Sequence, residues 1–148
     1  MPSKARGVRV PEVLEREIQR EADQRGKSWS ATTMELLTES LRMRRVPGIA
    51  FVDGTSGRRA VIAGTGLDVW EIIAAWKAGN ESFRGLKDNY PWLTEEQLRV
   101  ALGYYELFPQ EIEARLERER WWTPERLRQE LPFAVLKKGP FKAEVQRS

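Results

Sequence analysis

The chain has 148 residues, of which 41% are hydrophobic and 32% are charged, and its net charge at pH 7 is +3. This composition suits one ordinary domain or two very small ones and argues against a disordered chain. No apolar run approaches the roughly 18 residues of a membrane span, and the first residues lack the apolar core of a signal peptide. We therefore expect a cytoplasmic protein.

The sequence contains no cysteine and no histidine, which excludes disulfides, thiolate chemistry, the usual zinc sites and imidazole acid–base catalysis. The carboxylates are scattered beside basic residues along helical segments, as is typical of a solvated surface. We therefore expect no enzyme activity, no metal and no cofactor. The net charge is +3 over residues 1–46, −3 over 47–120 and +3 over 121–148, which predicts different partners for the ends and the middle.

The first 45 residues predict one short strand and two helices. The basic segment 4–10 alternates like a strand, with Val8 and Val10 on one side and Ala5, Gly7 and Arg9 on the other. Helical patterns follow on either side of Gly26, which provides a left-handed stop. These elements are too small to bury a core alone, so we predict that two copies pair their strands into a ribbon and interlock their helices. Such a ribbon fits the major groove of DNA.

Both helical patterns carry an apolar stripe that we expect to be buried. The first pattern covers Glu12–Arg25, and the second is capped by Ser28 or Ser30. The N-terminus of the second helix would offer free N–H groups and a positive dipole end to a phosphate. The stripe residues are Val13, Leu14, Ile18 and Ala22 in the first helix and Met34, Leu36, Leu37 and Leu41 in the second.

Residues 5–44 resemble the ribbon-helix-helix family of DNA-binding proteins in the spacing from Val10 to Gly26 and on to Leu37. The resemblance implies that outward strand side chains touch base edges and that the start of the second helix binds the DNA backbone. Two outward positions, Ala5 and Gly7, have almost no side chain, so we expect weak base readout. The alternative is an arm that only dimerises. The implied DNA-binding residues are Lys4, Arg6, Gly7, Arg9, Lys27, Ser28 and Ser30.

The helical pattern breaks at Val46-Pro47-Gly48, where we place the boundary between a domain over 1–45 and a second over 46–120. Two short strands, Ile49–Val52 and Arg59–Ala63, are predicted to form a hairpin around the turn 53–57. A helix capped by Asp68 and closed by Gly79 follows, and another begins at Ser82.

Two further helices complete the middle domain, and the first of them gives it a helix-turn-helix-like core through the tight connection 90–93. Residues 94–97 form a capping box. Because Glu95 and Glu96 would face phosphates with like charge, we do not expect this helix to read DNA. The two helices are expected to bury Leu98, Ala101, Leu102 and Tyr105, and Ile112 and Leu116.

Residues 47–116 resemble the small helical "domain of unknown function 433" family found in bacterial antitoxins. The resemblance implies a PIN-like ribonuclease toxin as partner and, with a ribbon-helix-helix start, a type II antitoxin similar to the VapB kind. Gly66 stands where the family usually has Arg, so any role of that Arg is absent. The residues that carry the resemblance are Pro47-Gly48-Ile49, the stretches 63–69 and 90–94, and Ala101-Leu102 with Tyr104-Tyr105.

The basic tail, residues 121–148, is predicted to bind the partner. It opens with a short helix that ends at Leu131-Pro132, and its large side chains suit a segment laid across a partner's groove. Basic residues would face the acidic site of a PIN-like nuclease. The alternative is that the aromatic side chains complete the core of the middle domain. The predicted toxin-binding residues are Trp121, Trp122, Arg126, Arg128, Phe133, Lys137, Lys138 and Phe141.

These patterns predict a mostly α-helical fold with a short N-terminal strand that pairs in a dimer, and a small helical domain with a short β-hairpin. The predicted function is an antitoxin that binds a PIN-like toxin and represses its own promoter DNA as a homodimer, or as a higher assembly with the toxin. The alternatives are a stand-alone transcription regulator without a toxin and an interaction module whose ribbon only dimerises.

Overall fold

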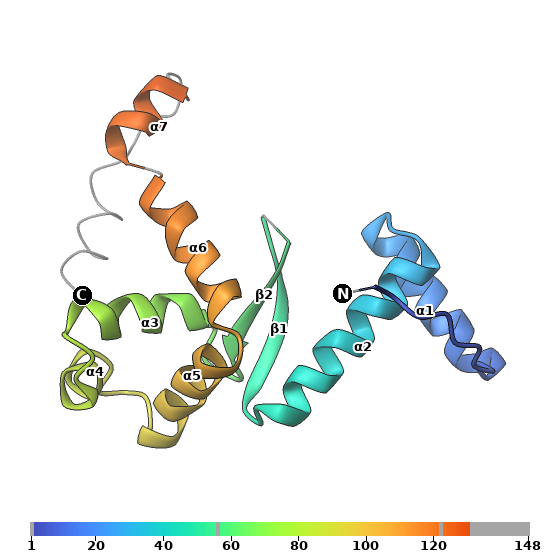
Figure 1. The fold of residues 1–148 in the computed structure, drawn as a ribbon, viewed down its shortest axis with the longest axis horizontal. Coiled ribbons are helices and arrows are strands. Elements are labelled where there is room, and N and C mark those ends of the chain that lie inside the picture. The colour runs from blue at the N-terminus through green and yellow to red at the C-terminus, as the bar shows by residue number, and fades with distance from the viewer. Residues whose placement is uncertain (1, 56, 122, 131–148) are drawn as a thin grey trace. The chain divides into compact units, whose positions relative to one another are not determined.

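The structure is a computed structural model that describes residues 2–55, 57–121 and 123–130. Two compact units make up the chain, Met1–Arg44 and Arg45–Ser148, which we call the N-terminal unit and the C-terminal unit. Helices dominate both units, and the described residues contain a single two-stranded antiparallel sheet (Figure 1). The prediction of a mostly helical fold with one β-hairpin is therefore confirmed.

Two helices form the body of the N-terminal unit. Helix α1 (Glu12–Arg25) follows Pro11 and ends at Gly26, which has a left-handed φ of +63° that favours glycine. Helix α2 (Trp29–Arg45) begins after Ser28, whose Oγ accepts a hydrogen bond from the Ala31 N–H at 3.1 Å. The predicted first helix and its stop are confirmed, and the cap of the second helix is Ser28 rather than Ser30.

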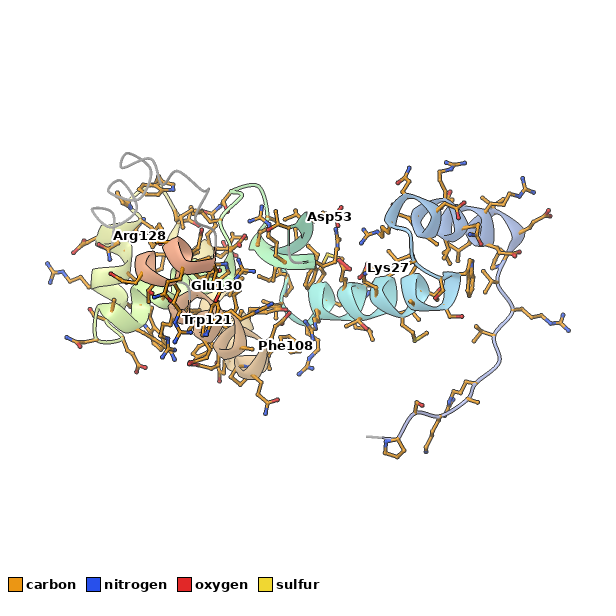
Figure 2. All side chains as sticks on the ribbon, turned by 90° about the horizontal axis from the view of Figure 1, so that it is seen from above. Lys27, Asp53, Phe108, Trp121, Arg128 and Glu130 are labelled. Atoms are coloured by element: carbon orange, nitrogen blue, oxygen red, sulfur yellow. The ribbon has the colours of Figure 1, made fainter. Side chains whose placement is uncertain are left out.

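Residues 2–11 belong to no helix or strand and form an arm that leads into α1 (Figure 2). The strand predicted over residues 4–10 is thus not formed within the single chain. A strand needs a neighbour that pairs with its N–H and C=O groups. The neighbour expected from the sequence is the same segment of a second copy, so the ribbon stays a prediction.

The C-terminal unit begins with the predicted hairpin, formed by β1 (Ile49–Gly54) and β2 (Gly57–Ile62). The strands pair in register from Ile49 opposite Ile62 to Gly54 opposite Gly57. Gly48, just before β1, has a φ of +102°, and a Cβ added there would meet Val100 Cγ2 at 3.0 Å. Both the left-handed backbone and the close approach of helix α5 (Glu95–Leu107) therefore require glycine at this position.

Five helices follow, and two of them pack against the hairpin. Helices α3 (Val69–Ala78) and α5 contact the strands, and α6 (Pro109–Trp121) packs on both of these helices. The predicted capping box is confirmed, because Thr94 Oγ1 accepts from the Gln97 N–H at 3.1 Å and Gln97 Oε1 accepts from the Thr94 N–H at 2.9 Å. No helix in the described part of the chain is long and apolar enough to span a membrane. The helices are α3 (Val69–Ala78), α4 (Phe83–Asn89), α5 (Glu95–Leu107), α6 (Pro109–Trp121) and α7 (Pro124–Glu130).

The C-terminal unit has a continuous apolar core between its hairpin and helices. Of the residues expected to be buried on α5, Leu98 and Ala101 are buried and Leu102 is partly buried. The fully buried tyrosine is Tyr104, whereas Tyr105 is partly buried, because steps of three residues from Leu98 keep Tyr104 on the core face. On α6, Ile112 and Leu116 are buried as predicted. The largest fully buried side chains of the unit are Tyr104, Ile62, Ile72, Ile73, Leu86, Leu98 and Val69.

Candidate functional site

The helices of the N-terminal unit carry a row of exposed apolar side chains. Within residues 2–44, the buried residues are Ile18, Ala22, Thr32 and Glu39. Helix α2 meets α1 near their junction, where the Trp29 indole donates to the Glu15 carbonyl at 3.4 Å. The expected burial of the two apolar stripes is therefore not achieved within one chain beyond Ile18 and Ala22. The exposed fractions are 68% for Val13, 47% for Leu14, 59% for Met34, 53% for Leu37 and 62% for Leu41.

The basic side chains predicted to contact DNA lie on the exposed arm. Lys4, Arg6 and Arg9 are all exposed, and the arm has no acidic residue before Glu12. A Cβ added at Gly7 would meet no atom within 4 Å. The arm is therefore accessible along its length and positively charged, as a segment that contacts phosphates must be.

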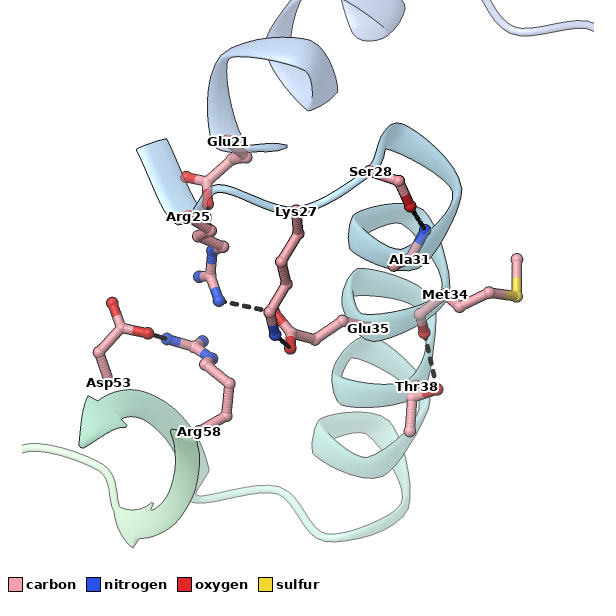
Figure 3. Close-up of polar contacts among 10 residues, drawn as sticks. All are labelled: Glu21, Arg25, Lys27, Ser28, Ala31, Met34, Glu35, Thr38, Asp53 and Arg58. Atoms are coloured by element: carbon pink, nitrogen blue, oxygen red, sulfur yellow. Dashed lines mark hydrogen bonds and ion pairs between the residues drawn. The ribbon is translucent and has the colours of Figure 1, made fainter. Parts of the chain in front are cut away.

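The remaining predicted DNA contacts lie at the start of α2, where Ser28 caps the helix and Ser30 is exposed. Lys27 is held by a residue that the sequence analysis missed, because its Nζ donates to Glu35 Oε2 at 2.9 Å (Figure 3). Arg25 donates to the other oxygen of Glu35 at 2.6 Å. The only signal in the sequence was that Glu35 lies two helical turns after the cap.

Asp68, expected to cap α3, occupies the N-cap position but makes no side-chain capping bond. Its buried carboxylate accepts hydrogen bonds from Arg59 of β2 at 2.6 Å and from the Trp70 indole at 2.8 Å. The Arg115 guanidinium lies 5.2 Å from the centre of the Trp70 ring. Asp68 is thus the predicted N-cap residue, but its carboxylate pairs with Arg59 instead of a backbone N–H, because a buried carboxylate is stabilised more by a cation than by one backbone N–H. This cluster links β2, α3 and α6.

Lys77 of α3 and Tyr105 of α5 both hydrogen-bond the Glu113 carboxylate of α6. The bonds from Lys77 and then Tyr105 lower the pKa of Glu113 below its ordinary value. The bonds to Glu113 and then Tyr105 raise the pKa of Lys77. The trio therefore keeps Lys77 and Glu113 charged and stabilises the packing of three helices. Among the described residues, no group of three or more Asp, Glu, His or Cys could hold a metal ion.

The connection between α4 and α5 exposes an aromatic residue beside an acidic helix start. Trp92 is 61% exposed, and its ring meets that of Tyr90 edge to face with centroids 5.6 Å apart. Burial, and then the charge of Glu71, raises the pKa of Tyr90. Glu95 pairs with Arg99 at 2.7 Å. Glu95 and Glu96 at the start of α5 are both exposed, and the absence of a DNA contact there stays a prediction.

A basic hollow lies between α6 and α7, lined partly by α6 and partly by the described start of the C-terminal tail. The hollow has a volume of about 420 Å³. Trp121 is 46% exposed, and the Arg126 guanidinium lies 4.6 Å from the centre of its ring. Arg128, also predicted to bind the toxin, is exposed on α7 (Figure 2). The other predicted toxin contacts, Trp122, Phe133, Lys137, Lys138 and Phe141, lie outside the described residues. The hollow is lined by Glu117, Arg118, Arg120, Trp121, Thr123 and Arg126.

Comparison with known proteins finds a match to one family within the C-terminal unit. Residues 49–105 match the family described as "Protein of unknown function (DUF433)". The match runs from the first residue of β1 into α5, so it covers the hairpin, α3 and α4 but neither the N-terminal unit nor α6 and α7. No curated protein and no solved structure matches the chain. The resemblance to the domain-of-unknown-function 433 family is therefore confirmed over these residues.

Proposed function

We propose that this chain is a dimeric DNA-binding protein of the ribbon-helix-helix kind that acts as the antitoxin of a type II toxin–antitoxin pair. The observation that carries the proposal is the row of exposed apolar side chains on α1 and α2 behind a basic arm. Burying apolar surface stabilises by about 25 cal/mol per Å², and a second copy can cover a row such as Leu37 and Leu41. The same association would let two arms pair as strands.

The pairing of two arms would create the DNA-contacting surface. In a ribbon, Val8 and Val10 would turn toward the helices, and Arg9 would turn outward with Gly7 toward the base edges. Lys4 and Arg6 would add positive charge along the backbone, and the start of α2 would lie beside a phosphate. Because few side chains would touch bases, binding would depend mainly on phosphates and fall steeply with salt.

The antitoxin role is supported by the family resemblance of the C-terminal unit and by the charge of the tail. PIN-like nucleases hold Mg²⁺ with clustered carboxylates, and a basic segment is complementary to such a site. The hollow between α6 and α7 offers Trp121 and Arg126 as contacts, and Arg128 is exposed on α7, with the remaining basic and aromatic residues of the tail after them. Autorepression of the promoter would follow from the DNA-binding half of the same chain.

The test is co-expression of the chain with the product of the adjacent gene. We expect a stable complex, measured by pull-down and light scattering, and relief of the growth defect that the adjacent gene causes alone. A chain that is monomeric, leaves upstream DNA unshifted at low salt and captures no toxin would contradict the proposal. Capture of upstream DNA without any toxin would instead favour the stand-alone regulator.

A truncated chain separates the two halves of the proposal. Deleting residues 121–148 retains Leu116, the last buried residue of α6, and with it the buried residues described for the C-terminal unit. We expect the truncated chain to dimerise and bind DNA as the full chain does but to lose toxin neutralisation. If it still neutralises the toxin, the toxin-binding surface lies on residues 46–120.

A further inference from the structure

Four charged side chains meet where α1 joins α2 (Figure 3). Arg25 bridges the helices, with its Nε 3.0 Å from Glu21 and its other nitrogen 2.6 Å from Glu35. Lys27 Nζ lies 2.9 Å from the second oxygen of Glu35. The Arg25 and Glu35 side chains are 17% and 20% exposed, whereas that of Lys27 is 47% exposed. Glu35 thus holds an ammonium group that solvent and other ligands can reach.

The position of Lys27 connects its ion pair with Glu35 to the proposed binding of DNA. Lys27 directly precedes Ser28, the cap of α2, so it lies at the helix start that the proposed function places beside a phosphate. The side chain of Glu35 lies on the side of α2 that faces Lys27, and Met34 points away from it (Figure 3). The charge of the cluster can therefore be changed without touching the apolar row.

We propose that Glu35 limits the DNA affinity of the N-terminal unit by competing with a backbone phosphate for Lys27. This inference rests on the proposed DNA-binding function. Each phosphate contact releases counterions. The logarithm of the binding constant therefore falls by about 0.9 per tenfold rise in salt concentration for each phosphate that the protein neutralises. A carboxylate already paired with Lys27 removes part of that contact and repels the incoming phosphate. Glu35 therefore weakens binding to any DNA sequence and leaves the contribution of base contacts unchanged.

The test compares Glu35→Gln with Glu21→Gln in the full chain. Both substitutions remove one negative charge from the cluster, but Glu21 contacts Arg25 rather than Lys27. Binding is measured by fluorescence anisotropy with a mixed-sequence duplex and with the duplex upstream of the gene, over a series of salt concentrations. For Glu35→Gln we expect about tenfold tighter binding at ~0.1 M salt and a salt slope steeper by up to about 1.8 for the two copies of a dimer. Glu21→Gln should change affinity much less.

Lys27→Ala, alone and combined with Glu35→Gln, shows whether the gain passes through Lys27. We expect Lys27→Ala to weaken binding only slightly in the natural chain and to abolish the gain in the combined variant. Equal gains for Glu35→Gln and Glu21→Gln, or a gain that survives Lys27→Ala, would overturn the inference while leaving the DNA-binding function intact. If the unsubstituted dimer binds neither duplex at low salt, the proposed function itself fails, and the inference fails with it.

Discussion

The two units of this chain use apolar residues at the same helical spacings and bury them to very different extents. In the C-terminal unit, residues such as Ile72, Leu98 and Tyr104 are fully buried by neighbouring elements of the same chain. In the N-terminal unit, Leu37 and Leu41 lie more than half exposed on a regular helix. Regular spacing therefore shows which face of a helix needs cover, and only the number of neighbouring elements shows whether one chain can supply it.

The difference follows from how many layers each unit can build. The hairpin gives α3 and α5 a surface to pack on, and α6 closes the core from a third direction. The N-terminal unit has two helices that meet near their junction and an arm without a partner strand. The C-terminal unit is therefore expected to be stable as a monomer, whereas the stability of the N-terminal unit should depend on protein concentration.

The comparison is tested most strongly by Leu37→Glu. If a second copy covers the row, each copy would bury an uncompensated carboxylate, at a cost of about 3–5 kcal/mol per copy. We expect light scattering to show a monomer and anisotropy to show loss of DNA binding. Gln19→Glu, which adds a negative charge at an exposed position of α1 whose neighbours on the helix surface include Glu15, Arg16 and Asp23, should leave the dimer intact. A dimeric Leu37→Glu chain would show that the exposed row does not form the interface.

The second test substitutes a residue in the core of the C-terminal unit rather than on the exposed row of the N-terminal unit. Ile72 is fully buried on α3, so Ile72→Ala should lower the free energy of unfolding by about 2–5 kcal/mol, and Ile72→Val by about 0.5–1.5 kcal/mol. Five of the six tryptophans belong to this unit, so urea titration followed by tryptophan fluorescence reports its unfolding. We expect the dimer affinity to stay unchanged, and a matching loss of dimer would show that the two units do not fold independently.

Features set by a few consecutive residues could be predicted from the sequence. The left-handed stop at Gly26, the capping box that starts at Thr94 and the hairpin around residues 53–57 all appear where their residue types demand them. Each depends on hydrogen bonds between neighbours in the chain, so no knowledge of the tertiary packing was needed.

Features set by residues distant in the sequence could not be predicted in the same way. Asp68 has the residue type of a helix cap, but its carboxylate pairs with Arg59, which only the packing of β2 against α3 brings near. Nothing in the sequence around Lys27 indicates a partner for its charge, and only the fold of α2 brings Glu35 beside it. The helices could therefore be predicted from the sequence, whereas the partners of these side chains could be identified only in the structure.

A smaller effect is expected from Arg9→Ala, which tests whether the proposed ribbon reads base edges. One lost base contact should weaken binding to the upstream duplex by about 1–3 kcal/mol, measured by anisotropy at one salt concentration. Dimerisation should stay unchanged, since Arg9 would face away from Val8 and Val10 in the proposed ribbon. Equal losses on the upstream and mixed-sequence duplexes would assign Arg9 to the phosphates, and an unchanged affinity would leave the arm with a dimerisation role alone.

The smallest effect concerns the trio that joins α3, α5 and α6 in the C-terminal unit. The Lys77 and Glu113 side chains are 34% and 40% exposed, so solvent screens their attraction. Glu113→Gln should therefore lower the free energy of unfolding by only about 0.5–1 kcal/mol at neutral pH. The matched control is Glu117→Gln, which removes a 77% exposed carboxylate 3.7 Å from Arg120 and should change stability by less.

The pH dependence of the Glu113→Gln effect distinguishes an ion pair from a packing contact. The pKa of Glu113 is lower in the folded chain than its ordinary value, so its contribution is complete above the ordinary carboxyl pKa of about 4 and is lost as the pH falls through the folded pKa. The pKa of Lys77 is raised, so its contribution is complete below the ordinary lysine pKa of about 10.4 and is lost as the pH rises beyond it. Urea titrations should therefore show a constant difference between the natural chain and Glu113→Gln from about pH 5 to about pH 10 that shrinks in more acidic and more alkaline solution. A difference that persists in acid would mean that Glu113 stabilises α6 through its packing rather than its charge.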